Sequence, residues 1–333
     1  MLKGRLGSAA WFLLGGMCAL VLVPFGFMGC QPGLEAAAPT GVLGAHGSAA
    51  PAVPRSVVAM SAALSARKPP RVVVSFTTFP LGTRMKGVGS LLRSLAHQTW
   101  RPDAVIVNLP DHVERLSSGP LAVPPEFDAW RKEYGWLVVH QTKDYGPATK
   151  LLGALEIEKD PDTIIVIVDD DTYYHEQTVA ALVGTMLASA TDVLPCFQCE
   201  EVYSDWHGEQ HWRYFGSEGQ CRGFASGYAA YAVRPRFFDE AIWDHARGPK
   251  GCRLHDDVWI SGHALVAAGV RPLLLRPGFD SITGEAIKDL GSRQQESVFV
   301  ANAKAAKSGE DPQGACVAHF PWLDERAGMH VAV

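Results

Sequence analysis

Apolar residues fall into short, nearly continuous runs that alternate with longer amphipathic stretches. The runs are rich in Val and Ile at consecutive positions, which is typical of strands covered on both faces. They predict strands at 72–76, 104–109, 136–140 and 163–168. Leu and Ala recur at helical spacing between them, at 87–98 and 148–158. This order of strand, helix, strand, strand, helix, strand predicts an α/β sheet.

The later part of the chain predicts more helices and one stretch of another kind. The helices are expected at 176–190, 257–268 and 292–306. Residues 196–219 mix Trp and Tyr with His, Asp and Glu without a clear period. We interpret that stretch as irregular, either a long functional loop or a small insert.

The N-terminus carries a candidate membrane segment. No charged residue lies between Arg5 and Glu35, and the apolar run at 9–29 is long enough to span a bilayer. Because Lys3 and Arg5 precede it, we predict that 1–30 is a cytosolic tail and signal anchor of a single-pass type II membrane protein in the Golgi or another secretory compartment. The alternative is a cleaved signal peptide, since Met28-Gly29-Cys30 resembles a bacterial lipoprotein cleavage site.

Composition divides the rest of the chain. Residues 31–70 are mostly Ala, Pro, Gly and Ser and predict a flexible stem. One globular domain is expected at 71–324, with a tail at 325–333. The 333 residues are 47% hydrophobic and carry a formal net charge of -5, so the charge argues against a nucleic-acid partner.

Five cysteines fall in the expected domain. An odd number in an oxidising compartment predicts two disulfides and one free or intermolecular thiol, and the spacing leaves the pairing open. Cys196 and Cys199 also resemble half of a zinc site, although no second Cys-x-x-Cys follows. The seven cysteines are Cys18, Cys30, Cys196, Cys199, Cys221, Cys252 and Cys316.

Three adjacent acids follow the strand expected at 163–168. Asp169, Asp170 and Asp171 would lie beyond the carboxyl end of a buried strand, where open α/β sheets bind ligands. Mg²⁺ or Mn²⁺ would relieve their repulsion and bridge them to a diphosphate. The alternative is a solvated turn that caps the next helix. A haloacid-type phosphatase fits less well, because it needs Thr or Val where this chain has Tyr173.

Three further motifs precede the acid cluster. They are Val73-Val74-Ser75-Phe76-Thr77-Thr78-Phe79-Pro80, the stretch from Ser90 to Pro102, and Lys143-Asp144-Tyr145-Gly146-Pro147-Ala148-Thr149-Lys150-Leu151. These motifs resemble the opening of family 2-like glycosyltransferases with the glycosyltransferase A fold. With the acid cluster, the resemblance runs from about Arg71 to Gly269. It implies a mostly parallel nucleotide-sugar-binding sheet sandwiched by helices, and a catalytic domain at 71–324.

The resemblance also implies roles for single residues. Thr77, Thr78 and Pro80 would line the nucleoside pocket, and Lys150 would approach the base or diphosphate, unless it is a surface helix residue. Asp169 and Asp170 would bind the donor. Asp169 and Asp171 would hold the metal, which a late His319 completes in some members of the fold. The family has an acid at the end of its second strand, where this chain has Asn108-Leu109-Pro110-Asp111, so the nucleotide stays open.

A second pair of acids precedes the helix expected at 257–268. An inverting transfer needs a carboxylate to deprotonate the acceptor hydroxyl, and the family's catalytic acid falls in this region. We therefore predict Asp256 or Asp257 as the base, with helix capping as the alternative role. The glycines of 223–228 would let backbone approach a sugar or form a simple turn. Trp206 and Trp212 would stack on acceptor sugars or fill a small core.

The expected function is metal-dependent transfer of a sugar, with inversion, from a UDP- or GDP-linked donor to an acceptor hydroxyl in the secretory lumen. The acceptor would be a glycan, a glycoprotein or a lipid. A retaining reaction, a metal-dependent phosphotransferase or nucleotide hydrolase, and a non-catalytic carbohydrate-binding protein on the same scaffold are the alternatives. A reaction that requires an acceptor would distinguish the sugar transferase from a hydrolase. Ligand binding without metal would favour the non-catalytic carbohydrate-binding protein.

Overall fold

The computed structural model of this chain describes residues 69–81, 84–275 and 311–324. The predicted anchor, the stem up to residue 68, the helix expected at 292–306 and the tail at 325–333 lie outside these residues. Within the described residues, no helix combines the length and the apolar composition needed to cross a membrane.

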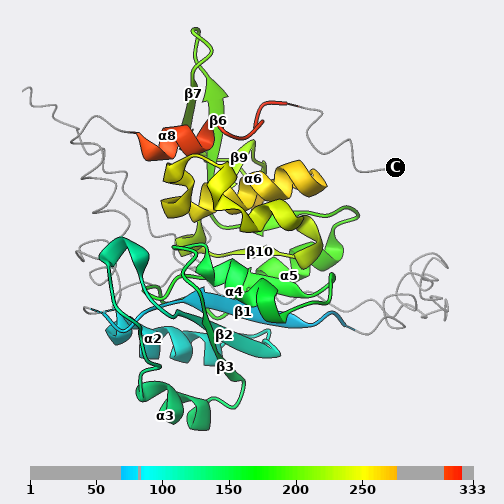
Figure 1. Ribbon diagram of the computed structural model, residues 1–333. Helices are drawn as coiled ribbons and strands as arrows, with labels where there is room; N and C mark the ends of the chain where they lie inside the picture. Colours follow the sequence, from blue (N-terminus) through cyan, green and yellow to red (C-terminus); the bar gives the residue numbers. More distant parts are fainter. Residues whose placement is uncertain (1–68, 82–83, 276–310, 325–333) are drawn as a thin grey trace, which may run out of the picture. The chain divides into compact units, whose positions relative to one another are not determined.

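An eight-stranded sheet forms the centre of the domain, in the order β3-β2-β1-β4-β10-β5-β11-β8. The strands β1 to β4 run parallel to one another (Figure 1). Strand β10 is antiparallel to β4 and β5, and β11 is parallel to β5. The fold is therefore α/β with a mostly parallel sheet, as predicted. The bounds are β1 (Val72–Thr77), β2 (Ala104–Pro110), β3 (Leu137–Thr142), β4 (Ile164–Ile167), β5 (Leu194–Cys196), β8 (Gly219–Gln220), β10 (Tyr231–Val233) and β11 (Pro272–Leu274).

The helices fall close to their predicted positions. Those predicted in the described part differ from the observed bounds by at most two residues. The α-helix between β2 and β3 was not predicted, because Phe127 is its one buried residue and leaves no apolar stripe. The helices are α2 (Met85–Ala96), α3 (Glu126–Glu133), α4 (Thr149–Ile157), α5 (Thr178–Ala188), α6 (Asp256–Ala268) and α8 (Pro312–Val317). Short 3₁₀ helices are η1 (Glu114–Leu116), η2 (Gly227–Ala229), η3 (Pro235–Phe237), η4 (Glu240–Trp243), η5 (His245–Arg247) and η6 (Lys250–Leu254).

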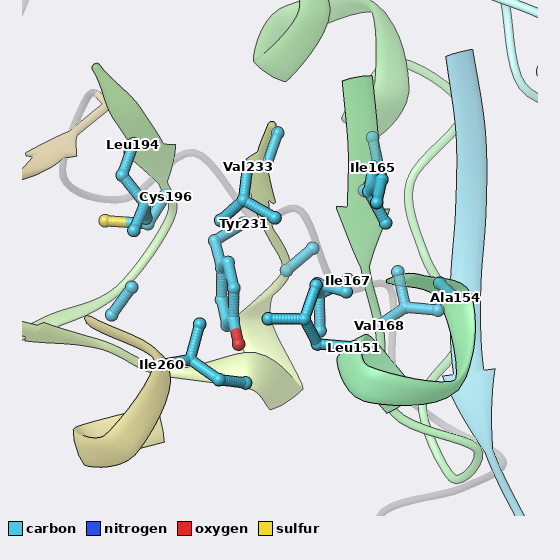
Figure 2. Packing of buried hydrophobic residues seen from close by; sticks show 14 of the residues in the cluster. Leu151, Ala154, Ile165, Ile167, Val168, Leu194, Cys196, Tyr231, Val233 and Ile260 are labelled. Atoms are coloured by element: carbon cyan, nitrogen blue, oxygen red, sulfur yellow. The ribbon is translucent and has the colours of Figure 1, made fainter. Parts of the chain in front are cut away.

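The buried core lies between the sheet and the helices packed on it. Leu151 of α4 is fully buried, as are Ile167 of β4 and Val233 of β10, and the three belong to one cluster (Figure 2). Burial of each such side chain contributes about 1.5–3 kcal/mol. Gly153 lets α4 come close to β2, since a Cβ at that position would lie 2.3 Å from Asn108 Oδ1. This close approach brings the start of α4 to the carboxyl ends of the parallel strands.

A small second sheet corrects one sequence prediction. The stretch from residue 196 contains a regular hairpin of β6 (Cys199–Ser204) and β7 (Gln210–Tyr214), extended by β9 (Gly223–Ala225) in the order β7-β6-β9 (Figure 1). The prediction of a small insert is confirmed, but the prediction that the stretch is irregular was wrong. The alternation was hard to see because Val202 is the one fully buried residue between Cys199 and the turn, and its cross-strand partner Trp212 is half-buried.

Two disulfides confirm the prediction made from the odd number of cysteines. Cys199 pairs with Cys221 and Cys252 pairs with Cys316, while Cys196 is buried with a free thiol. The half zinc site suggested by Cys196 and Cys199 is excluded, since Cys199 is in a disulfide. The first bond fastens the hairpin to the segment before β9, and the second ties η6 to α8.

Buried histidines predict an acid-sensitive fold. His263 of α6 contacts the rings of Trp259 and Phe320, and burial lowers the pKa of both His263 and His245 to about 4. In the unfolded chain each ring takes up a proton near its usual pKa of 6.5, whereas in the folded protein it stays neutral until the pH approaches 4. The free energy of unfolding therefore has its full value above pH 6.5 and falls as the pH drops towards 4.

We expect stability to fall by about 1 kcal/mol per pH unit for each histidine in that range. Urea unfolding of the full-length chain between pH 7 and 4.5 would measure the slope. The variant His263→Met should show a shallower slope than wild type, and His97→Gln, which changes an exposed histidine, is the control. Equal slopes for wild type and His263→Met would contradict the expectation.

Candidate functional site

The acids predicted to bind the donor lie at the carboxyl edge of the parallel strands. Val168 and Asp169 follow β4, and Ile167 of β4 pairs with Ser75 two residues before the end of β1. Asn108 of β2 pairs with Thr77 at the same edge. Ligands of open α/β sheets bind at this edge. The register thus brings the ends of the first, second and fourth strands together.

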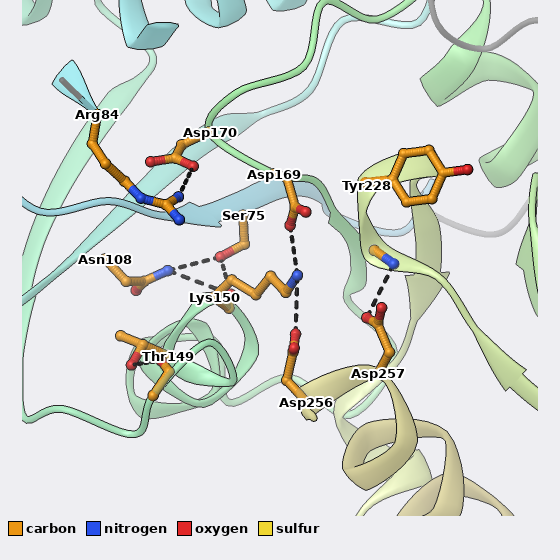
Figure 3. A network of polar contacts seen from close by, with 12 residues as sticks. Ser75, Arg84, Asn108, Thr149, Lys150, Asp169, Asp170, Tyr228, Asp256 and Asp257 are labelled. Atoms are coloured by element: carbon orange, nitrogen blue, oxygen red, sulfur yellow. Dashed lines mark hydrogen bonds and ion pairs between the residues drawn. The ribbon is translucent and has the colours of Figure 1, made fainter. Parts of the chain in front are cut away.

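Lys150 is a buried cation between two groups of acids. The residue is 4% exposed, and its Nζ lies 2.6 Å from Asp169 Oδ1 and 2.9 Å from Asp256 Oδ2 (Figure 3). Burial acts to lower the pKa of Lys150, but Asp169 and Asp256 hold it well above its usual value. The surface alternative for Lys150 was therefore wrong. The first turn of α4 is fixed by Ser75 Oγ, which donates to the Lys150 carbonyl at 2.5 Å.

The middle acid of the cluster points to another cation. Asp170 is 2% exposed, and its Oδ1 lies 2.6 Å from Nη1 of Arg84, just before α2. Burial raises the pKa of Asp170, and Arg84 opposes that rise. The guanidinium of Arg84 also lies 5.2 Å from the centre of the Phe79 ring. Asp170 is thus held by the protein itself, while Asp169 and Asp171 are half-buried.

Asp171 and Asp257 have raised pKa values. Burial, Asp170 and Asp169 raise the pKa of Asp171 to about 7. Burial and the neighbouring Asp256 raise the pKa of Asp257 well above its usual value. Asp257 Oδ1 accepts a hydrogen bond of 3.0 Å from the backbone N–H of Gly227. Both pKa values are therefore raised by burial first and by neighbouring carboxylates second.

A short turn closes the site opposite α4. Gly227 begins η2, and a Cβ there would lie 2.5 Å from Lys150 Nζ and 2.9 Å from Asp257 Oδ1, so a larger residue would displace these two charged groups. Ala230, which follows η2, has φ 73° and ψ 144°, a backbone conformation that is costly for alanine. The Tyr174 hydroxyl donates to the Tyr228 carbonyl at 3.0 Å and accepts from the Asp169 N–H at 2.9 Å. The turn is thereby tied to both groups of acids.

The residues predicted for the nucleoside pocket lie at the ends of β1 and β2. Thr77 donates its hydroxyl to the Asn108 carbonyl at 2.9 Å, and the buried Thr78 hydroxyl acts to lower the pKa of Asp170. Pro80 is half-buried in the segment that follows β1. Beyond β2 an open cavity is lined by Asp111, His112, Ser118, Gly119 and Pro120. The position of Asp111 places an acid just after the second strand, one residue past its end.

His319 lies apart from the acids that it was predicted to join at a metal. Its ring is stacked 6.2 Å from Trp259 and lies 4.9 Å from Phe320, in an aromatic group between α6 and α8. Within the described part of the chain, three possible metal ligands whose ligand atoms lie within 4.8 Å of one another are found elsewhere, at the turn of the hairpin. It consists of Asp205, Glu209 and His211. The role of His319 as a ligand that completes the metal site stays a prediction.

Sequence reasoning missed three members of the site. Arg84 is a basic residue at the start of a helix, where the helix dipole disfavours it, and that anomaly was a usable signal. Tyr174 gave none, because its link between Asp169 and the turn depends on residues far apart in the chain. Tyr231 of β10 is fully buried with no hydrogen-bond partner for its hydroxyl among the described residues, close enough to Asp257 to interact with it electrostatically.

The donor atoms of the site fit a hard divalent cation. Asp169 and Asp171, which flank Asp170 in the sequence, are half-buried. Carboxylate oxygens are the ligands that Mg²⁺ and Mn²⁺ prefer. Asp170 Oδ2 and Asp256 Oδ2 are buried without a partner of hydrogen-bond geometry, although Asp256 Oδ2 lies within ion-pair distance of Lys150. A further positive charge would relieve the repulsion that raises the pKa of Asp171.

Comparisons with known proteins find similarity in structure alone. A scan against protein-family models finds no match, and a search of curated proteins finds none. Among solved structures, TarS 1-349 from S. aureus is 14% identical over 62% of this chain and 59% of that chain, with a TM-score of 0.41. GalNAc-T7 with UDP, GalNAc and Mn2+ is 13% identical over 62% of this chain and 41% of that chain, with a TM-score of 0.40. At such scores neither neighbour informs on the substrate or the reaction of this chain.

Proposed function

We propose that this chain is a nucleotide-sugar-dependent glycosyltransferase that transfers a sugar to an acceptor hydroxyl with inversion, using Mn²⁺ or Mg²⁺. The observation that carries the proposal is the presence of two sets of carboxylates at the carboxyl edge of the sheet. Asp169 and Asp171 form one set, and Asp256 and Asp257 form the other. Lys150 joins the two groups. One group suits a diphosphate with its cation, and the other suits an acceptor hydroxyl.

The donor side would use the half-buried acids after β4. Asp169 and Asp171 would hold the divalent cation together with the diphosphate of a UDP- or GDP-sugar. When bound, that cation stabilises the negative charge on the departing nucleoside diphosphate. Asp170 is buried in its ion pair with Arg84, and Lys150, which pairs with Asp169, adds positive charge on the donor side. Thr77, Thr78 and Pro80 are proposed to contact the nucleoside.

The acceptor side would use Asp257 as the general base. Asp257 is half-buried, whereas Asp256 is buried and paired with Lys150, so Asp257 is the more accessible carboxylate. Its raised pKa favours uptake of a proton. The acceptor hydroxyl would give its proton to Asp257, its oxygen would bond to the anomeric carbon, and the bond from that carbon to the diphosphate oxygen would break, with the electron pair leaving on the diphosphate.

We also propose that the domain works in the lumen of a secretory compartment, anchored through the apolar segment at 9–29. Support comes from the two disulfides, because such bonds persist in oxidising compartments. The acceptor would then be a glycan, a glycoprotein or a lipid that reaches that lumen.

The test is a screen of UDP- and GDP-sugars with the purified full-length chain. Binding by calorimetry and release of the nucleoside diphosphate would be measured with Mn²⁺, with Mg²⁺ and with EDTA, each with and without an acceptor panel. We expect one nucleotide sugar to bind only with the cation and to release its diphosphate faster with an acceptor. Release at a rate independent of every acceptor would favour a hydrolase, and binding of sugars without a cation would favour a non-catalytic protein.

A further inference from the structure

An exposed tyrosine stands beside the proposed base. Tyr228 is 45% exposed although its neighbours in η2 are buried, and its ring extends outward from the edge of the polar network that contains Asp169 and Asp257 (Figure 3). Its backbone is fixed, because Gly227 donates to Asp257 and the Tyr228 carbonyl accepts from Tyr174. An exposed aromatic ring on a rigid backbone offers apolar contact area at low entropic cost.

Polar groups suited to hydroxyls lie next to this ring. The Tyr228 hydroxyl donates to the side-chain oxygen of Gln198, and the Gln198 amide donates to Glu200 Oε1 at 3.2 Å. Burial raises the pKa of Glu200, which shows that its carboxylate is partly withdrawn from water. Glu200 is the cross-strand partner of Tyr214, whose ring is 54% exposed. Two exposed rings therefore flank an amide and a carboxylate.

We infer that Tyr228, Tyr214, Gln198 and Glu200 form the acceptor subsite and that the acceptor group bound there is a sugar ring. The inference rests on the proposed function, whose base Asp257 interacts electrostatically with the Tyr228 hydroxyl. A pyranose has an apolar C–H face that packs on an aromatic ring, and hydroxyls around its edge that need hydrogen-bond partners. The subsite provides both, and it leads from Asp257 towards the base of the β6–β7 hairpin.

The opposite face of the hairpin provides the control. Tyr203 is 38% exposed, similar to Tyr228, but it pairs with His211 and so lies on the face of β6 opposite Glu200. The guanidinium of Arg213 lies 5.2 Å from the centre of its ring. The same change of Tyr to Ala at this position removes an exposed ring without touching the inferred subsite.

The experiment uses the full-length chain and methyl glycosides of hexoses, N-acetylhexosamines and their disaccharides as acceptor probes. With the donor found in the screen, Tyr228→Ala should raise the acceptor KM by about tenfold or more, whereas Tyr228→Phe, which keeps the ring, should stay within about threefold. Tyr203→Ala should match wild type. Saturation-transfer NMR in EDTA should show contact with the C–H protons of the best glycoside, lost in Tyr228→Ala.

The outcomes separate the inference from the proposed function. If wild type binds and hydrolyses no nucleotide sugar, the proposed function fails, whatever the glycosides do in NMR. If wild type hydrolyses the donor but Tyr228→Ala keeps the acceptor KM and the NMR contacts, the sugar subsite is wrong. Transfer to a peptide or lipid acceptor that is insensitive to Tyr228→Ala would overturn it equally.

Discussion

Replacing both Asp169 and Asp171 with Asn should lower transfer by about a thousandfold or more and abolish binding of Mn²⁺ at this site. The amides keep the size of the side chains but remove the two charges that would hold the cation and, through it, the diphosphate. Calorimetry with Mn²⁺ and assay of nucleoside diphosphate release would measure both effects, with circular dichroism to confirm the fold.

The hairpin turn supplies the matched control. Asp205, Glu209 and His211 form the other group of potential ligands in the described part of the chain, and Asp205→Asn with His211→Gln removes two of them. This control variant should keep both transfer and its dependence on the cation. If it loses them while the Asp169 and Asp171 variant stays active, the cation binds at the hairpin and the proposed donor site is wrong.

Replacing Lys150 with Met should have the largest effect on stability, a loss of about 3–5 kcal/mol at pH 7. Methionine fills a similar space but leaves Asp169 and Asp256 without the ammonium that lies 2.6 and 2.9 Å from them. Urea unfolding in EDTA would measure the loss. Lys159→Met changes an exposed lysine on the same segment and should stay within about 0.5 kcal/mol of wild type.

The loss should also depend on pH. Without Lys150 the buried carboxylates have a raised pKa in the folded state, so the folded protein binds more protons than the unfolded one. Stability of the variant should therefore fall as the pH rises above about 4, the usual range of Asp, and the gap to wild type should be wider at pH 8 than at pH 5. A gap that is constant or narrows with pH would show that Lys150 stabilises the fold in another way.

The sequence by itself determined the parallel half of the fold. Continuous runs such as Ile164–Ile167 are buried on both faces and cannot be surface loops, so their strands and, apart from α3, the helices between them were predictable to within two residues. The strands β5, β10 and β11 were missed because each has three residues, too few for a period. The hairpin was predicted to be irregular, because its residues are mostly half-exposed or exposed and show no clear alternation.

The acid cluster was also predictable from the sequence, because three carboxylates directly after an apolar strand indicate a ligand site at the edge of the sheet. Their partners were decided by the tertiary structure alone. Lys150 is an unremarkable lysine at a helix start until α4 buries it between Asp169 and Asp256, which are 87 residues apart in the chain by their numbers. Ion pairs, the closeness of Gly227 to Lys150 and the place of His319 beside Trp259 all depend on which distant segments pack together, and local pattern carries no information on that.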